Sequence, residues 1–228
     1  MFYTENQRFT KHAQVGSQNA TLDSLRSNLY LYANISKGQW LSTGKYSQTG
    51  KTATITINSN FMNYIWHYDS PLGGITLASD GEALVGLWFD GQKYFADTLE
   101  DEHEEKSLPI FDETCRWLDI YFSGTAPDFT PPLKMPASPF RKRVLEILLT
   151  IPFGDTMTYG EIASIIAREK GQKQMSAQAV GGAVGHNPVA LIIPCHRVVG
   201  ASGNLIGYAA GTDKKRRLLN MERNHSAS

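Results

Sequence analysis

Cysteine is scarce in this chain of 228 residues, which contains only Cys115 and Cys195. Two cysteines are too few for a disulfide framework or for a zinc site built from four thiolates. We therefore expect neither a disulfide framework nor a zinc-thiolate centre. We also expect a reducing cytoplasmic compartment, where a lone cysteine is more often reactive than structural.

Long apolar runs and an excess of one charge are absent as well. No stretch reaches the roughly 18 apolar residues that a membrane-spanning helix needs. The first residues also lack the basic and apolar pattern of a secretion signal. Lys and Arg together number 22, as do Asp and Glu, so the formal net charge is zero. The sequence thus predicts neither a membrane protein nor a secreted one.

The balanced charge is distributed unevenly. Residues 1–130 hold 9 basic and 16 acidic side chains, a difference of −7, whereas residues 131–228 hold 13 and 6, a difference of +7. A basic half is typical of a nucleic-acid-binding surface. It is equally compatible with two halves of opposite charge that pack together, and charge alone leaves both interpretations open.

The first 61 residues are polar and weakly patterned, apart from a Thr-Ile alternation at residues 54–57. Segments of this composition bury little apolar surface. We interpret residues 1–61 as a polar extension of uncertain order or a small appendage.

Regular patterning begins after the extension. Alternating apolar residues predict strands over residues 64–68, 75–79 and 84–89, with a tight turn between the last two. A helical spacing of apolar residues follows over residues 112–122 and puts Cys115 on the inward face, which predicts that Cys115 belongs to the core.

Acidic and proline-rich segments divide the remaining chain. The acidic run at residues 100–105 is interpreted as a solvated loop, and prolines mark a linker at residues 131–137. We therefore expect an N-terminal domain over residues 62–130 and a C-terminal domain over residues 138–225.

Three helices are predicted beyond the linker. Ser138, Thr158 and Ser176 are in position to cap their N-termini, and Glu161 completes a capping box with Thr158. The last two helices resemble a helix-turn-helix. The third, over residues 177–185, is almost entirely Ala, Val and Gly, although glycine costs about 1 kcal/mol per position in a helix interior. This favours either insertion into a nucleic-acid groove or close packing within the domain.

The local sequence around Cys195 is typical of a presented thiol. An apolar run at residues 189–193 leads into Pro194 and Cys195, and two basic side chains, His196 and Arg197, follow. Neighbouring positive charge lowers the pKa of a thiol from its free value of about 8.5. Many free cysteines are inert core residues instead, so the hexapeptide alone leaves both interpretations open.

Residues 194–197, Pro-Cys-His-Arg, follow an Asn187-Pro188 turn, and residues 181–183, Gly-Gly-Ala, lie upstream. From about Asn63 to Glu222 the chain resembles the O6-alkylguanine-DNA alkyltransferases, also called methylated-DNA–protein-cysteine methyltransferases. The resemblance implies an RNase H-like α/β N-terminal domain with a small antiparallel sheet plus a helix. A helical, helix-turn-helix or winged-helix-like C-terminal domain would follow and carry the active site.

The resemblance also implies an activity and a partner. The chain would repair double-stranded DNA by direct reversal, moving a methyl or small alkyl group from guanine O6, and from thymine O4, to Cys195. The protein would bind the minor groove and flip the damaged base out. No cofactor is implied. Some members of the family hold a zinc with cysteines of the N-terminal domain, which this chain lacks there, so we expect no metal. Each molecule would react once as a monomer, and in a bacterium it would be cytoplasmic and associated with the nucleoid.

Catalytic roles carry over to matching positions. Cys195 would accept the alkyl group, His196 would take the thiol proton through a water, and Glu222 would orient the imidazole. Such a chain is chemically sensible because the carboxylate stabilises the imidazolium, which in turn stabilises the thiolate. Asn187 would brace the turn that carries the cysteine.

Substrate contacts carry over in the same way. Tyr159 would contact the damaged guanine and the rotated phosphate, and Tyr208 would form a wall of the guanine pocket. The carbonyls of Cys195 and Val198 would accept hydrogen bonds from the base, and Arg197 is assigned to substrate binding as well.

Two positions depart from the family pattern. Gln178 stands where the family commonly has an arginine that fills the gap left by the flipped base. Ala209 stands where a serine often donates a hydrogen bond to the guanine O6. Gln178 could still enter the gap with its amide but brings no charge. Because base extrusion costs a few kcal/mol, this either weakens binding to duplex DNA or shifts the load to Arg168, Lys170 or Lys173.

Three other functions remain as alternatives. A lesion sensor of the same fold would lack the cysteine. A methylation-responsive DNA-binding regulator would need a zinc-thiolate domain, for which residues 1–60 have no cysteine. A cysteine hydrolase using Cys195 and His196 would normally have its base far from the nucleophile in sequence.

Overall fold

The structure is a computed structural model that describes residues 62–99, 102–136 and 138–226, together with strand backbones within the first 61 residues. The chain forms two compact units, residues 1–61 and residues 62–228.

The described strands of the first unit form three antiparallel hairpins, β1–β2, β3–β4 and β5–β6. The Thr-Ile alternation at residues 54–57 lies outside the described residues, and the interpretation of residues 1–61 as an extension stays a prediction. The strands are β1 (Ala13–Val15), β2 (Gln18–Ala20), β3 (Leu31–Ser36), β4 (Gln39–Gly44), β5 (Tyr46–Gln48) and β6 (Lys51–Ala53).

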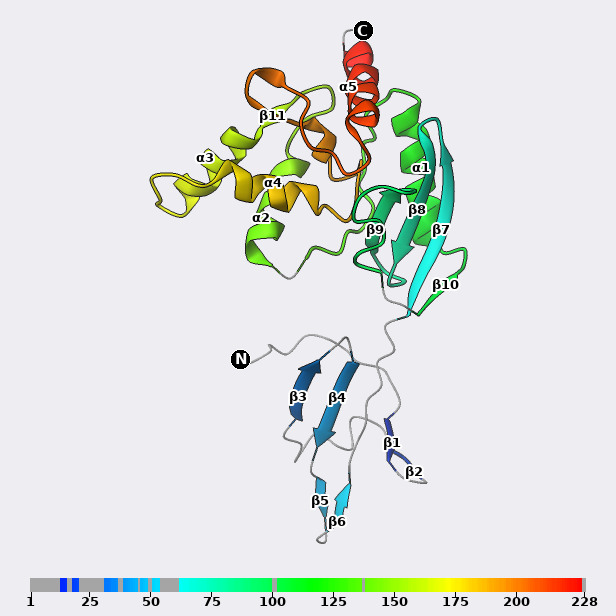
Figure 1. Cartoon of the computed structure of the whole chain (residues 1–228). Helices are drawn as coiled ribbons and strands as arrows, with labels where there is room; N and C mark the ends of the chain where they lie inside the picture. Colours follow the sequence, from blue (N-terminus) through cyan, green and yellow to red (C-terminus); the bar gives the residue numbers. More distant parts are fainter. Residues whose placement is uncertain are drawn as a thin grey trace. The chain divides into compact units, whose positions relative to one another are not determined.

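The second unit begins with a four-stranded sheet of order β10-β7-β8-β9 (Figure 1). The three predicted strands are confirmed as β7 (Asn63–Ser70), β8 (Gly73–Ser79) and β9 (Leu84–Phe89), which pair antiparallel. The prediction of a loop over the acidic run is wrong for β10 (His103–Glu105), which pairs parallel with β7. The sheet is therefore mixed. An edge strand tolerates this sequence because its charged side chains stay in solvent while its backbone pairs.

Strand β9 is buried along its whole length. A bulge shifts the alternation of its side chains: Gly86 pairs with Ala78 and Leu84 with Ser79, so Val85 is an extra residue and Leu84 turns to the same face as Leu87. That face packs into the main core.

The opposite face of the sheet has its own cover. There, Trp88 and Val85 pack with the segment that follows β9, through Ala96 and Leu99.

Helix α1 (Pro109–Phe122) packs against β7 and β8 (Figure 1). It begins before the predicted start at Asp112 because Pro109 at the first turn has no helical hydrogen bond to lose. Cys115 is half-buried at the margin of the core, whereas Phe111, Leu118 and Tyr121 fill it.

The three predicted helix starts beyond the linker are confirmed. The side chains of Ser138, Thr158 and Ser176 each accept a hydrogen bond from a backbone N–H in the first turn of the helix that follows. Glu161 closes the capping box with Thr158. The helices are α2 (Pro139–Leu149), α3 (Tyr159–Glu169) and α4 (Ala177–Gly185).

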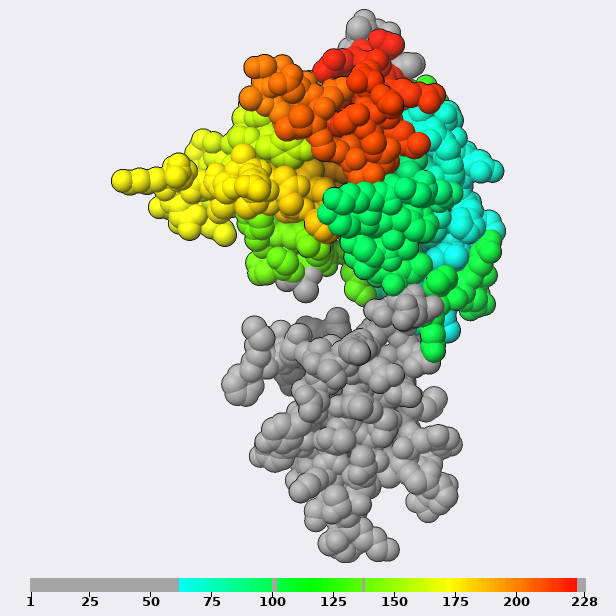
Figure 2. Space-filling view, viewed as in Figure 1, coloured from blue at the N-terminus to red at the C-terminus, as the bar shows by residue number. Residues whose placement is uncertain are grey.

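Helices α3 and α4 form the predicted helix-turn-helix. The yellow segment that connects them projects from the rest of the second unit, and its residues 170–174 are exposed (Figure 2). Helices α2, α3 and α4 pack against one another.

The last part of the chain returns to the core. A short 3₁₀ helix, η2 (Cys195–Arg197), runs into β12 (Val198–Val199), which pairs parallel with β11 (Met157–Thr158). A second 3₁₀ turn, η3 (Ala201–Gly203), precedes the C-terminal helix α5 (Thr212–Ser226).

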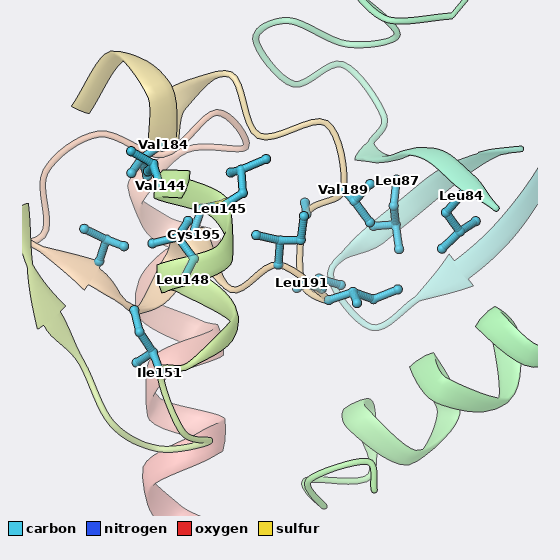
Figure 3. Close-up of a cluster of buried hydrophobic side chains, with 14 of the residues drawn as sticks. Leu84, Leu87, Val144, Leu145, Leu148, Ile151, Val184, Val189, Leu191 and Cys195 are labelled. Carbon is cyan, nitrogen blue, oxygen red and sulfur yellow. The ribbon is translucent and has the colours of Figure 1, made fainter. Parts of the chain in front are cut away.

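Backbone hydrogen bonds join the sheet to the segment before the cysteine. Leu87 N–H donates to the carbonyl of Pro188 (2.8 Å), and Ala190 N–H donates to the carbonyl of Leu87 (2.9 Å). The free edge of β9 is thereby covered, and one apolar core continues from the sheet to Cys195 (Figure 3). None of the helices described is long and apolar enough to span a membrane.

Candidate active site

Cys195 lies on the wall of a cavity of about 280 Å³. The cavity also brings together Tyr159, Asn187, Tyr208 and Ala209, four residues that the sequence analysis assigned to one site. His196, Arg197 and Glu222 do not line it but form a buried cluster next to it.

The segment that presents the thiol is held rigidly. Asn187 accepts a hydrogen bond from Val189 N–H (3.1 Å), and its amide donates to the carbonyls of Val189 (3.2 Å) and Ile193 (2.8 Å). Leu191 within this segment has a φ of 66°, a left-handed conformation that a leucine rarely adopts without tertiary support. These three hydrogen bonds agree with the bracing role predicted for Asn187, which stays a prediction.

The thiol of Cys195 is in an apolar environment that opposes its ionisation. Burial raises the pKa of Cys195, while a hydrogen bond from the Asn187 side chain and the positive charge of Lys215 act in the opposite direction. Figure 3 draws Cys195 within the apolar cluster that includes Val144, Leu145 and Val184. A thiolate here needs a neighbouring proton acceptor and a stabilising cation.

His196 and Glu222 are paired behind the cysteine. His196 Nε2 lies 2.7 Å from Glu222 Oε1, and both side chains are fully buried. Burial lowers the pKa of His196, and the hydrogen bond with Glu222 opposes this effect. His196 Nδ1, by contrast, is buried and has no hydrogen-bond partner in the described part of the chain, so it is the nitrogen available for a further proton.

Glu222 is held as a carboxylate. Burial would raise the pKa of Glu222, but the hydrogen bond with His196 and the guanidinium of Arg197 lower it to about 2. Gly154 N–H also donates to Oε2 at 3.1 Å.

Arg197 does not line the cavity, and its assignment to substrate binding stays a prediction that this geometry does not support. Its Nε donates to Glu222 Oε2 (2.9 Å), one terminal nitrogen donates to Oε1 (3.1 Å) and the other donates to the carbonyl of Ile151 (2.7 Å). The physical reason is that a buried carboxylate needs a charged partner with several donors, which a guanidinium provides. Arg197 thus neutralises Glu222, and its charge acts there rather than on an incoming base.

A buried lysine that the sequence analysis did not single out lies beside the cavity. Lys215 has no exposed surface, and its ammonium donates to the carbonyls of Val198 (2.5 Å), Ile206 (2.8 Å) and Gly207 (3.2 Å). Burial lowers the pKa of Lys215 to about 8, while the nearby Cys195 thiolate opposes this. The cation that favours the Cys195 thiolate is therefore Lys215 rather than the adjacent Arg197.

The burial of Lys215 could have been inferred from the sequence. It belongs to the basic run at residues 214–217, which suggests a solvated face. However, Lys215 is spaced with Leu218, Leu219 and Glu222 at intervals of three, four and seven residues, so it lies on the buried face of α5.

Two tyrosines bound the cavity. Tyr159 hydroxyl donates to the carbonyl of Ile206 at 3.3 Å, and its pKa is raised by burial and by Cys195. The hydroxyl of Tyr208 is buried without a hydrogen-bond partner among the described residues. The carbonyl of Val198, predicted to face the base, accepts from Lys215, and the carbonyl of Cys195 accepts from Val198 N–H.

The segment after β9 forms a wall that sequence reasoning missed. Gln92, Lys93 and Tyr94 line the cavity, and Lys93 N–H donates to the carbonyl of Ala209 at 3.0 Å. The ring of Tyr94 stacks on His186, with centroids 4.0 Å apart. No motif marks this wall, because it depends on the long-range packing of the sheet against the C-terminal helices.

Gln178 lies apart from the cavity, exposed in the first turn of α4. The same helix presents Gly182 and Gly185, where an added Cβ would meet no atom within 4 Å, and Gly181, where it would make only ordinary contact with Tyr159. Packing within the described chain therefore does not require glycine at these positions. In residues 62–99, 102–136 and 138–224, no three His, Cys, Asp or Glu side chains gather as a metal site.

A buried thiol at a cavity, a His-Glu pair behind it and an exposed helix-turn-helix are the features expected of a DNA-binding protein that uses a cysteine nucleophile. Two family models match the chain: the ribonuclease-like domain of 6-O-methylguanine DNA methyltransferase over residues 63–135, and the DNA binding domain of the same protein over residues 139–224. The chain belongs to the 6-O-methylguanine DNA methyltransferase family.

Curated relatives agree with this assignment. The chain is 41% identical over 163 residues to the methylated-DNA–protein-cysteine methyltransferase of Mycobacterium tuberculosis, covering 70% of this chain and 94% of the relative. It is 35% identical over 161 residues to that of Haemophilus influenzae, covering 70% and 86%. Among solved structures, Mycobacterium tuberculosis OGT in complex with DNA matches with a TM-score of 0.62 and 40% identity, covering 71% of this chain and 94% of that one. The predicted fold class is confirmed, apart from the parallel edge strand β10.

Proposed function

We propose that the protein repairs alkylated DNA by direct reversal, transferring a methyl or small alkyl group from guanine O6, and from thymine O4, to Cys195. The observation that carries the proposal is the sulfur of Cys195 at the wall of a cavity, with the buried His196–Glu222 pair beside it. The membership of the chain in the methyltransferase family supports the reaction type.

The proton of the thiol goes to His196. The S–H bond of Cys195 breaks, and the proton passes, through a water, to Nδ1, since Nε2 is occupied by Glu222. The products are a thiolate and an imidazolium, which Glu222 stabilises. Lys215 adds a second positive charge that favours the thiolate.

The thiolate then attacks the alkyl carbon in line. A carbon–sulfur bond forms as the carbon–oxygen bond to guanine breaks, and the electron pair leaves with the base, which takes up one proton at a ring nitrogen to become guanine. Tyr159 and Tyr208 line the cavity, and their hydroxyls are the donors best suited to the charge that develops on the departing guanine. The thioether cannot revert by hydrolysis, so each molecule acts once.

The helix-turn-helix supplies the DNA contact. Gly182 and Gly185 leave open space on α4, which suits close approach to the minor groove of a duplex, and Gln178 would enter the gap left by the flipped base. Neither a cofactor nor a metal is needed, because the alkyl donor is the DNA itself. We extend the proposal to a monomer that acts in the cytoplasm on duplex DNA.

The domain boundaries follow the same proposal. Residues 62–130 would form the α/β domain, residues 131–137 the linker and residues 138–225 the domain that binds DNA and accepts the alkyl group. Residues 1–61 would be an extension that precedes these domains.

The decisive experiment mixes the full chain with a duplex that carries one O6-methylguanine. We expect the peptide containing Cys195 to gain the mass of one CH₂ unit, with restored guanine in the duplex. Cys195→Ser should show neither, and Cys115→Ser should behave as the wild type. An unmodified Cys195 peptide after complete incubation would reject the proposal in favour of a lesion sensor or regulator, and turnover of a small ester would favour a hydrolase.

A further inference from the structure

The hydroxyl of Tyr121 reaches the His196–Glu222 pair from helix α1, in the ribonuclease-like part of the chain. Tyr121 Oη donates to Glu222 Oε1 at 2.7 Å and lies 3.1 Å from His196 Nε2. Tyr121 has no exposed surface, and 101 residues separate it from Glu222 in sequence.

The direction of these hydrogen bonds follows from the available hydrogens. The carboxylate of Glu222 carries none, because its pKa is lowered to about 2. The phenol keeps its single hydrogen, since burial and the nearby Glu222 raise the pKa of Tyr121 well above its ordinary value. The hydroxyl therefore donates to the carboxylate, and its lone pairs face the imidazole.

His196 Nε2 thus lies within hydrogen-bond distance of two acceptors, Tyr121 Oη and Glu222 Oε1. A nitrogen between two acceptors carries the hydrogen itself. The lone pair of the neutral ring is then on Nδ1, the atom that has no partner among the described residues.

The ring of Tyr121 is fixed before any substrate arrives. It stacks on Trp117 with centroids 5.2 Å apart, and it meets the rings of Phe122 and Phe153 edge-on at 5.3 and 6.0 Å. A phenylalanine would satisfy this packing, so the hydroxyl has no packing role. A buried hydroxyl is retained at little cost only where it is hydrogen-bonded.

We propose that Tyr121 is a positioning residue of the proton relay. Its hydroxyl holds the Glu222 carboxylate and, as a second acceptor at Nε2, stabilises the imidazolium that forms when His196 takes the thiol proton. The ribonuclease-like part of the chain therefore contributes to thiol activation and does not serve only as a support. The inference rests on the proposed function for its use, but it concerns the thiol before any DNA binds.

The test measures the pH dependence of Cys195 alkylation by iodoacetamide without DNA, with peptide mass spectrometry to separate Cys195 from Cys115. In Tyr121→Phe we expect alkylation near neutral pH to be slower by about tenfold, and its midpoint to move to higher pH by about one unit, since one unit corresponds to a tenfold change. Loosened packing would act in the opposite direction, exposing the thiol and speeding its alkylation.

The matched control is Tyr68→Phe, which removes another phenol–carboxylate hydrogen bond of the same part of the chain, from Tyr68 to Asp119 at 2.8 Å. We expect it to leave the profile of Cys195 unchanged. A Tyr121→Phe profile that coincides with the wild type, or is shifted to lower pH, would overturn the inference.

A second measurement needs no variant. Nitrogen-15 NMR of the imidazole in the wild-type protein should show His196 protonated at Nε2, and the Nδ1–H form would overturn the inference even if Tyr121→Phe fails to fold. If the alkylation profile of Cys195 depends on Tyr121 but the protein takes no methyl group from DNA, the proposed function is rejected and the role of Tyr121 stands.

Discussion

Arg197 and Glu222 form a buried two-pronged ion pair, with nitrogen–oxygen distances of 2.9 and 3.1 Å. The arginine is only two positions from Cys195, yet its guanidinium does not line the cavity. The pair shares its carboxylate with His196, so the group that is hydrogen-bonded to the imidazole is itself neutralised and fixed. The relay is therefore a packed polar cluster whose members depend on one another.

Arg197→Ala should destabilise the fold by about 3–5 kcal/mol, because it leaves the Glu222 carboxylate buried without its ion-pair partner. Arg197→Lys should recover only part of this loss, since an ammonium cannot make the two-pronged contact. Urea denaturation measures both. Arg143→Ala, which removes an exposed pair with Glu169, is the control and should change stability far less. A loss in Arg197→Ala no larger than in the control would contradict the buried pairing.

Acid should unfold the protein partly through Glu222. Its pKa is lowered from 4.5 to about 2 in the folded state, so its contribution is complete above pH 4.5 and is lost as the pH falls towards 2. The loss is on the order of 3 kcal/mol. The pKa of His196 is lowered from 6.5 by burial, so acid opposes folding there too. The free energy of unfolding, measured between pH 7 and pH 3, should fall less steeply in Glu222→Gln than in the wild type. An equal slope would contradict the assignment.

The sequence predicted the parts of the site that lie close together along the chain. The cap residues and the Asn187–Cys195 segment depend on local hydrogen bonds, which the residue types themselves indicate. Lys215 was missed because a basic run resembles a solvated face, although its spacing with Leu218 on α5 held the correct information. Tyr121 had no local signal, since its partner is 101 residues away and only the packed fold brings the two together.

The same distinction explains the error at β10 and the side-chain direction of Arg197. The edge strand β10 has an acidic sequence that favours a loop, and only the neighbouring β7 provides the backbone partners that make it a strand. Arg197 next to Cys195 suggested a substrate contact, but the direction of its side chain is decided by Glu222, which lies in another element. Tertiary partners that are distant in sequence override local preference in both cases.

Asn187→Ala should loosen the segment that presents the thiol. Three hydrogen bonds to Val189 and Ile193 are lost and their buried backbone groups are left unpaired, which should cost about 3 kcal/mol of stability. The pKa of Cys195 should also rise, because the hydrogen bond from Asn187 lowers it. Chemical denaturation and the pH profile of iodoacetamide labelling check the two effects. Asn204→Ala, in an exposed turn, is the control, and a variant with both properties unchanged would exclude a bracing role.

Ala209→Ser should speed repair. Ala209 lines the cavity, and a serine there would place a hydroxyl donor beside Cys195 and Tyr208. One additional hydrogen bond to the departing oxygen is expected to raise the single-turnover rate by roughly tenfold, since about 1.4 kcal/mol corresponds to that factor. Ala210→Ser, at the next position but outside this cavity, is the control. Quenched-flow measurement of alkyl transfer should show a faster rate in Ala209→Ser alone. Equal rates in the two variants would mean that residue 209 does not contact the base.

Gln178→Arg should improve repair of duplex DNA in particular. Gln178 is exposed in the first turn of α4, and a longer cationic side chain there would fill the gap left by a flipped base more completely. Because base flipping costs a few kcal/mol, we expect roughly a tenfold gain in the rate on duplex substrate. Single-stranded DNA has no such gap, so its repair should change little.

The gain could also come from the added positive charge alone. Gln174→Arg distinguishes an effect of charge from an effect of filling the gap. It adds the same charge at an exposed position of the segment before α4, and it should strengthen binding to both substrates in a manner that weakens with added salt. If Gln178→Arg and Gln174→Arg raise repair of both substrates equally, position 178 acts through charge and not as the group that replaces the flipped base. A gain confined to duplex DNA and to position 178 means instead that glutamine limits base extrusion in this chain.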